Sequence, residues 1–334
     1  MALKPPVEVP QGAIRLNTDS QKLEFYAQDQ WWEMATDVPT LDGGARGVFM
    51  GMSSPGGDSQ ISYITIPTAG NAIDFGSRTI TGMGANLSSR TRGLSAGDTA
   101  PTYVNTIDYI TMSSTGAALD FGDRTNTAAR SRGCSNQTRG IWAGGFIAPA
   151  AKDVIDYVTI ASTGNAVDFG DLSGNRENPS GNINSPTRAI WSGGDTDGAG
   201  NFSEQIQYVT IATTGNTQYF GDLTIARAHG AGLSSATRGI IGSGYVSPTG
   251  INSIEFLTIA TLGNSAEFGD CTVAKYGRGS TTDCIRGVFV AGQPSTVNTI
   301  DYVNISTQGD ATDFGDYTNG CGLEGGCSTG HGGL

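Results

Sequence analysis

Two kinds of charged residue recur along the chain in a fixed setting, and both could do chemistry. An arginine opens each of six similar segments, in three of them within Thr-Arg-Gly, and an aspartate follows a Phe-Gly pair near the end of five of them. Six guanidinium groups around one channel would bind an anion, and converging carboxylates would hold a metal ion. The arginines are Arg46, Arg92, Arg139, Arg188, Arg238 and Arg286. The aspartates are Asp123, Asp171, Asp222, Asp270 and Asp316.

We predict a structural role for both sets, because features that recur in every copy of a repeat usually belong to its scaffold. Each arginine could pair with a carboxylate of its own or an adjacent copy, such as Asp120, Asp168, Glu267 or Asp313. Aspartates spread one per copy cannot converge on one ion, so we expect them to cap turns. The sequence therefore predicts no metal site and no cofactor.

Enzyme signatures are sparse. The chain has two histidines, His229 and His331, which leaves little for a catalytic triad or a facial metal site. A pair of carboxylates for glycoside hydrolysis stays open, because their pairing is spatial and cannot be read from spacing. We expect a protein that is not an enzyme.

Composition limits the class of protein further. The chain has 334 residues, 50 of them glycine, with 15% charged residues and a net charge of -12. Glycine without a three-residue period suits many tight turns, and the low charge argues against disorder. The acidic balance and the lack of a basic run disfavour nucleic-acid binding. We see no secretory signal and no apolar stretch long enough to span a membrane.

The five cysteines are irregularly spaced and odd in number. We expect small buried thiols made in a reducing compartment, with a disulfide between Cys321 and Cys327 as the alternative. Zinc binding is disfavoured because no Cys-x-x-Cys pair occurs.

The six copies recur at intervals of about 46 to 51 residues, which indicates a repeat architecture. In the copy around Arg238, four strands are expected: Ala226–Ser234, Arg238–Gly242, Ile254–Ile259 and Ser265–Phe268. A Gly-Asn pair such as 263–264 between the last two predicts a type II′ hairpin. Four antiparallel strands per copy are typical of a β-propeller blade.

The layout resembles the kelch class of propellers. A diglycine ends the second strand, as in Gly144-Gly145 and Gly193-Gly194, and an aromatic strand follows. The Trp of the kelch pattern near the fourth strand is replaced here by the Phe of Phe-Gly-Asp. The resemblance implies an all-β, six-bladed propeller over residues 41–334.

Ring closure can also be read from the ends of the array. The first copy begins abruptly at Leu41-Asp42-Gly43-Gly44, without a first strand, and the last copy is followed by a spare one at Asn319–Ser328. We predict that this C-terminal strand completes the first blade, which removes the exposed edges of an open array.

Residues 1–40 differ from the array. Lys4–Pro10 predicts an extended arm, and three short strands at Ala13–Asn17, Leu23–Tyr26 and Trp31–Met34 predict a small β-meander. So few residues cannot bury their own aromatic side chains, so the meander must dock on the ring, on another copy or on a partner. The aromatic residues assigned to attachment or oligomerisation are Phe25, Tyr26, Trp31 and Trp32.

The meander carries a second resemblance. Its sequence over Gly12–Glu33, G-A-I-R-L-N-T-D-S-Q-K-L-E-F-Y-x-x-x-x-W-W-E, resembles a short module of bacteriophage tail, fibre and other virion proteins. The resemblance implies a virion location, other virion proteins as partners, and a homo-oligomer such as the trimer common among phage fibres.

Loops on one face vary between copies while the scaffold stays uniform. Connections between the second and third strands range from SPGGDSQ to DTDGAGNFSEQ, and the connection Leu172–Pro186 after a fourth strand is also long. Variation on one face indicates a recognition surface, although plain solvated loops would vary too. Aromatic rings beside Asp and Asn suit either a sugar or a protein contact. The candidate binding residues are Phe146, Asp195, Asp197, Asn201, Phe202 and Tyr245.

The sequence thus predicts a non-enzymatic phage virion protein of the tail-fibre or adhesin type. Its target is a host-surface glycan or protein, or a neighbouring virion protein. The alternatives are a tail-spike glycan hydrolase or lyase, a capsid decoration protein, and a bacterial kelch-type scaffold.

Overall fold

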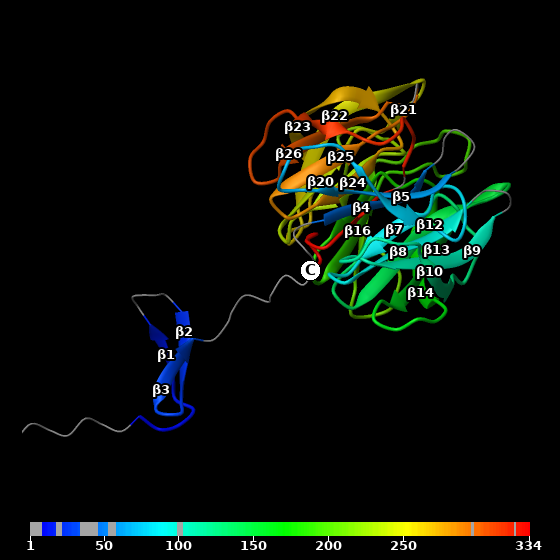
Figure 1. Ribbon diagram of the computed structural model, residues 1–334. Helices are drawn as coiled ribbons and strands as arrows, with labels where there is room; N and C mark the ends of the chain where they lie inside the picture. Colours follow the sequence, from blue (N-terminus) through cyan, green and yellow to red (C-terminus); the bar gives the residue numbers. More distant parts are fainter. Residues whose placement is uncertain are drawn as a thin grey trace, which may run out of the picture. The chain divides into compact units, whose positions relative to one another are not determined.

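A computed structural model describes residues 9–17, 22–33, 46–52, 58–98, 103–294, 297–323 and 325–334. Every regular element in these ranges is a β-strand, and none of their segments is a helix that could cross a membrane (Figure 1). The chain divides into two compact units, Met1–Thr40 and Leu41–Leu334. Most of the predicted extended arm and the abrupt start of the first copy, residues 41–45, lie outside the described residues.

The first unit is a three-stranded antiparallel meander. Its strands are β1 (Ile14–Asn17), β2 (Lys22–Ala27) and β3 (Gln30–Glu33), in that order. On one face Arg15 pairs with Glu24 at 2.8 Å and lies 4.1 Å from the ring centre of Trp31. The other face presents exposed apolar side chains: Ile14, Leu16, Leu23, Phe25 and Trp32. Since strand residues alternate between faces, the register that pairs Phe25 with Ile14 and Trp32 gathers them on one side.

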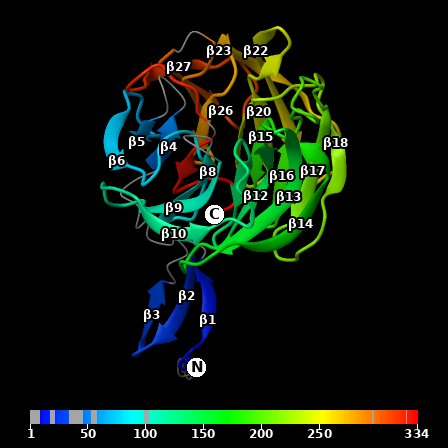
Figure 2. The ribbon, with the colours of Figure 1, turned by 90° about the vertical axis from the view of Figure 1, so that its right-hand side faces the viewer.

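The second unit consists of antiparallel sheets, six in the described part of the chain (Figure 2). The first sheet contains β28 (Cys327–Ser328), β4 (Arg46–Met52), β5 (Asp58–Thr65) and β6 (Ile73–Ser77). The second contains β7 (Ala85–Ser88), β8 (Arg92–Asp98), β9 (Val104–Thr111) and β10 (Leu119–Asp123). The third contains β11 (Arg132–Ser135), β12 (Arg139–Ile147), β13 (Ala150–Thr159) and β14 (Val167–Arg176).

The remaining sheets repeat this order. The fourth contains β15 (Gly181–Asn184), β16 (Arg188–Ser192), β17 (Gln205–Thr210) and β18 (Gln218–Asp222). The fifth contains β19 (Ala231–Ser234), β20 (Arg238–Gly242), β22 (Thr249–Thr258) and β23 (Ala266–Lys275), with the short β21 (Tyr245–Val246) beside β22. The sixth contains β24 (Gly279–Thr282), β25 (Arg286–Val290), β26 (Thr299–Asn304) and β27 (Thr312–Asp316).

Burial falls from the first strand of each sheet to the fourth. All four residues of β19 are buried, whereas β23 begins with exposed residues around Phe268. The first strands contact one another in the order β7, β11, β15, β19, β24, β28 and β7. Glycine permits this close approach: a Cβ at Gly232 would lie 2.3 Å from the backbone nitrogen of Asn182 on the neighbouring strand. The arrangement is therefore propeller-like, with the first strands innermost.

The hydrophobic core is split into layers between sheets. Each of six buried clusters combines side chains of two neighbouring sheets. In one of them Trp142 of the third sheet packs with Leu87 of the second, and in another Phe49 of the first sheet packs with Val288 of the sixth. Two-sided burial explains why the third strands are apolar over most of their length.

The recurrent arginines have a structural role, but their predicted carboxylate partners are wrong. Each guanidinium donates to a backbone carbonyl at the end of the third strand of the next sheet, as Arg188 does to Ile259 at 2.6 Å and Arg286 does to Pro67 at 2.8 Å. The other four donate to Met112, Ile160, Ile211 and Ile305. Each also lies 4.6 to 5.0 Å from an aromatic ring centre of its own sheet. A carbonyl is a suitable partner because it is fixed by the strand, whereas a surface carboxylate is solvated.

The predicted type II′ hairpin at the Gly-Asn pairs is also wrong. Between β13 and β14 the chain makes a longer connection over residues 160–166. There Gly164 donates its N–H to Phe121 of the preceding sheet at 2.8 Å, and the Asn165 side chain accepts from the N–H of Asp123 at 3.1 Å. The Phe-Gly-Asp segments are thus capped through their backbone by the next sheet, rather than capping turns with their own carboxylates.

Four buried ion pairs, which the sequence analysis did not predict, recur at equivalent positions of four sheets. They are Arg78–Asp108, Arg124–Asp156, Arg227–Glu255 and Arg278–Asp301, with side chains no more than 2% exposed. Each joins the segment before a first strand to a third strand. Breaking such a pair leaves a buried charge without its partner, which typically costs about 3 to 5 kcal/mol.

The bounds of the first and fourth strands differ from those expected from the sequence. The first strand is shorter than predicted, beginning at Ala231 rather than Ala226, because the residues before it enter the buried pair at Arg227 and a left-handed turn at His229. The fourth strand is longer, and β14 takes up part of the connection predicted for Leu172–Pro186. Of the predicted closing strand, Cys327 and Ser328 pair with Val48 and Gly47 of β4.

Replacing Arg188 with Met should lower the free energy of unfolding by about 2 to 3 kcal/mol, because a charge-assisted hydrogen bond and a stack on Tyr208 are lost together. Urea unfolding followed by circular dichroism measures this. Lys152→Met, which removes a charge from a partly exposed position of β13, is the control and should change stability by less than about 0.5 kcal/mol. Equal stability of the two variants would contradict the structural role.

Candidate functional site

One end of the sheets carries a series of left-handed residues that precede the first strands. Arg130, Asn178 and His229 have φ values of 58°, 47° and 57°, and Gly277 has 59°. Their backbones are joined from sheet to sheet, because the N–H of Asn178, His229, Gly277 and Leu323 each donates to the previous member of the series at 2.8 to 3.0 Å. We call the opening inside this series the mouth. A residue other than glycine in this conformation costs about 1 to 2 kcal/mol.

A cavity of about 380 Å³ occupies the mouth. This volume falls within the range of small-molecule sites, about 300 to 1,000 Å³. It is lined by residues from several sheets: Met83, Arg130, His229, Tyr276, Gly277, Gln293 and Gly322. Of the left-handed series, Arg130 and His229 contribute their side chains to this cavity, whereas Gly277 contributes backbone and Asn178 is buried outside the lining.

Arg130 is the cationic side chain of this cavity. Its guanidinium is 39% exposed and lies 5.4 Å from the ring centre of Phe146. Its Nη1 donates to Glu177 at 3.5 Å, which is long for a charge-assisted hydrogen bond. Burial raises the pKa of the Glu177 carboxyl, although Arg130 opposes this shift. The ion pair is therefore weak, and the Arg130 guanidinium keeps N–H donors that Glu177 does not use.

His229 is held as neutral imidazole. Burial, followed by the guanidinium groups of Arg132 and Arg130, lowers the pKa of His229 to about 3. A neutral imidazole donates from one nitrogen and accepts at the other, so it can bind a hydroxyl group in either sense. The positive charge of the same two arginines also disfavours protonation of His229.

Aromatic rings extend from His229 across the loops. Tyr276 lies 5.7 Å from His229 and 4.9 Å from Tyr245, and Tyr245 lies 5.7 Å from Phe202. All are partly exposed. Two of the predicted binding residues, Tyr245 and Phe202, are therefore brought together in an aromatic row that leads to the mouth.

Asp195 organises the loop that separates β16 from β17. It is 6% exposed, and its carboxylate accepts backbone N–H groups from Asp197 at 3.2 Å, Gly198 at 3.0 Å and Gly200 at 2.8 Å. Asp197 accepts from Ala199 and from the Asn201 amide, which lowers its pKa. The predicted acidic residues thus lie on the expected loop, but they bind their own backbone and set its shape.

Phe146 is enclosed rather than free. Arg130 stacks on it, Tyr103 lies 6.3 Å away, and a Cβ at Gly198 would lie 2.9 Å from its ring. Its ring therefore packs against Arg130 and does not line the mouth cavity. Asn201 and Phe202 line a separate, open groove of about 560 Å³ on the outer side of the fourth sheet.

Sequence reasoning missed Arg130, His229 and Tyr276. They precede first strands, whereas the predicted binding residues lie in the loops between second and third strands. The signal that could have found them is the alignment of copies on their arginines: Arg130 stands nine residues before Arg139, and His229 stands nine before Arg238, so unlike polar residues share one scaffold position.

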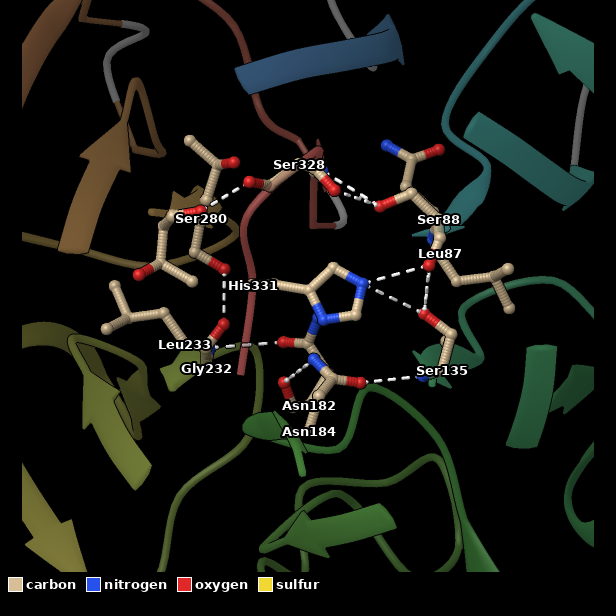
Figure 3. A pocket seen from close by; sticks show the side chains of 15 residues that line it. Leu87, Ser88, Ser135, Asn182, Asn184, Gly232, Leu233, Ser280, Ser328 and His331 are labelled. Carbon is tan, nitrogen blue, oxygen red and sulfur yellow. Dashed lines mark hydrogen bonds between the residues drawn. The ribbon is translucent and has the colours of Figure 1, made fainter. Parts of the chain in front are cut away.

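Beneath the mouth, the inner strands enclose a polar channel (Figure 3). Hydroxyl and amide groups join successive first strands, as Ser135 does to Ser88 at 2.7 Å and Ser234 does to Asn184 at 2.7 Å. His331 fills the centre, with Nε2 2.9 Å from the Ser88 carbonyl oxygen. The remaining cavity of about 20 Å³ has room for about one water molecule. The channel therefore belongs to the scaffold.

Two Gly-x-Ser-x-Gly sequences, Gly93–Gly97 and Gly326–Gly330, resemble a nucleophile elbow in letters alone. Ser95 is fully buried on β8, and Ser328 on β28 donates to Thr282 and accepts from Gly330. An elbow places its serine on a sharp strand-to-helix turn, which neither position offers. Within the described ranges no group of three His, Cys, Asp or Glu could hold a metal ion, and the five cysteines are free thiols, so Cys321 and Cys327 are not joined.

Comparison with known proteins gives a likeness of fold. No protein-family model matches the chain, and no curated protein matches it in sequence. Among solved structures, the one titled "Structure of YjhT" is similar with a TM-score of 0.61 and 8% sequence identity, over 73% of this chain and 87% of that chain. At this identity the likeness concerns the fold alone.

Acidification should destabilise the protein partly through His331. Burial lowers the pKa of His331 to about 4, and its Nδ1 accepts from the N–H of Gly333 at 3.1 Å, an acceptor that protonation removes. Because the folded pKa lies below the unfolded value, the stabilisation is complete above about pH 6.5 and is lost between about pH 6.5 and 4.

The measurement compares urea unfolding of the wild type and of His331→Gln at pH 7, 5 and 4. Relative to the variant, the wild type should lose up to roughly 3 kcal/mol across this range. Parallel curves for the two proteins would contradict the assignment.

Proposed function

We propose that this chain is a non-enzymatic bacteriophage virion protein of the tail-fibre or adhesin type. In this proposal residues 41–334 form a closed six-bladed β-propeller of kelch-like repeats that binds a host-surface ligand or a neighbouring virion protein. Residues 1–40 attach the chain to the particle or to further copies of itself. The protein needs no cofactor for this role.

The observation that carries the proposal is the contrast between the two ends of the sheets. At one end, the six arginines and the Gly-Asn connections repeat the same contacts from sheet to sheet. At the other end, equivalent positions hold unlike side chains around a cavity. A uniform scaffold that displays variable loops at one face is the usual design of a recognition protein.

Closure of the ring is supported by three independent contacts. β28 pairs with β4, the sixth sheet packs on the first through Phe49 and Val288, and Arg286 donates to Pro67. The pairing is the counterpart of the one between first and second strands in the other sheets, and the other two contacts are counterparts of those between consecutive sheets.

Attachment through the first unit is supported by its exposed apolar face. Trp32 is 43% exposed and Phe25 37%, beside three exposed aliphatic side chains. Such a patch on a three-stranded meander too small to form a core usually marks an interaction site. Trp31 and Tyr26, by contrast, pack with each other and with Arg15 on the opposite face.

A tail-spike glycan hydrolase or lyase is the second candidate. It is favoured by His229, Tyr276 and Arg130 at the mouth, with Glu177 paired to Arg130. Release of reducing ends from host polysaccharide, abolished by Glu177→Gln, would establish the enzyme in place of the binding protein.

Cryo-electron microscopy of the particle tests the proposed function. We expect the chain at the tail or fibre, and we expect the purified protein to bind host cells and compete with the particle for adsorption. A location on the capsid shell would indicate a decoration protein, and absence from the particle would overturn the virion assignment.

Replacing both Phe25 and Trp32 with Ser should reduce self-association or incorporation into particles at least tenfold, because two large apolar groups leave the interface. Analytical ultracentrifugation and particle assembly measure this. The matched control is Leu262→Ser, which replaces an exposed apolar side chain of the second unit. Unchanged assembly of the double variant would contradict attachment through this face.

A further inference from the structure

The backbone at the mouth offers evidence of selection for side chains. Gly277 shows that glycine suits this scaffold position, and it makes the same sheet-to-sheet hydrogen bond as its neighbours. Arg130 and His229 adopt the same left-handed conformation at a conformational cost that glycine would avoid. Asn178 shares this conformation but is buried outside the cavity lining, so it is the combination of strain with a place in the cavity wall that points to a role of Arg130 and His229 beyond folding.

Both of these strained residues line the same cavity. Arg130 and His229 come from the segments before β11 and β19, which are separated by the whole third and fourth sheets in sequence. Tyr276 completes the wall, 5.7 Å from His229. A cation with several N–H donors, a neutral imidazole and a phenol ring thus surround one space of about 380 Å³.

The charge of the cavity limits its ligand. Among the described residues, the Arg130 side chain makes one hydrogen bond, the long one to Glu177, and a guanidinium has five N–H donors in a planar fork that suits a carboxylate. Arg132, fully buried on β11, adds positive charge near His229. Glu177 beside Arg130 disfavours a doubly charged group such as a phosphate monoester, so the fitting anion carries a single charge.

We infer that the mouth cavity binds the carboxylate of an acidic sugar, a uronic acid residue, through Arg130, while His229 and Tyr276 contact its hydroxyl groups and ring. This assignment rests on the proposed binding function and names its ligand class. Arg130 donates charge-assisted hydrogen bonds to the carboxylate. His229 donates to one hydroxyl group and accepts from another, and the Tyr276 ring packs on the apolar face of the sugar. No covalent step is involved.

The test measures binding of the full-length protein to glucuronate, galacturonate and mannuronate by isothermal titration calorimetry and ligand-observed NMR. The matched neutral hexoses and their phosphate monoesters serve as comparison ligands. At least one uronate should bind ten times more tightly than its neutral hexose and its phosphate ester. No preference for any uronate, or a preference for the phosphate, overturns the assignment.

Arg130→Gly and His229→Gly should each weaken uronate binding at least tenfold, and for His229→Gly the melting temperature should stay equal or rise, because glycine adopts this backbone freely. A merely structural arginine or histidine would instead lower the melting temperature and leave binding intact, which overturns the proposal. Cys284→Gly is the control: it has φ of 70° in the turn between β24 and β25, at the opposite end of the sheets, and should leave binding unchanged.

The two proposals can fail separately. Host-cell binding that survives Arg130→Gly, together with no uronate preference, overturns the cavity assignment and leaves the adhesin function intact. Uronate binding that depends on Arg130, in a chain absent from the particle, supports the cavity assignment and overturns the virion location.

Discussion

The fold depends on contacts that each sheet makes with the next. The arginine at the start of each second strand stacks on an aromatic ring of its own sheet and donates to a carbonyl of the following one. At the same time a side-chain oxygen of an Asn or Asp at the next connection accepts the N–H that follows five of the six Phe-Gly pairs, as Asp310 does for Asp270. Both contacts join neighbours without using a loop at the mouth end of the sheets, so those loops can change independently of the scaffold.

Much of the architecture could be predicted from the sequence because its signals are local and repeated. The Phe-Gly pairs and arginines set the period, and apolar runs such as the one in β22 identified the third strands. Partners across sheets could not be predicted in the same way. Arg188 finds a carbonyl rather than a carboxylate, and Asn165 reaches a backbone amide 42 residues away, because spacing within one copy does not show what the neighbouring copy presents.

The candidate site was predicted only in part for a related reason. Tyr245 and Phe202 were found because their loops vary in length, whereas Arg130 and His229 differ only in side-chain type at a position of constant backbone. Asp195 and Asp197 were expected to face a ligand, but short glycine-rich loops leave many N–H groups that need acceptors. The carboxylates of Asp195 and Asp197, which belong to the same loop, accept these N–H groups.

His331 and the polar groups around it fill the channel between the innermost strands, which leaves room for about one water molecule. A polymer therefore cannot thread through this channel from one end of the sheets to the other. If the mouth binds a surface polysaccharide as proposed, the polymer would have to enter by a terminal residue or by a short branch, and it would be recognised through its chain ends and side groups rather than along its backbone.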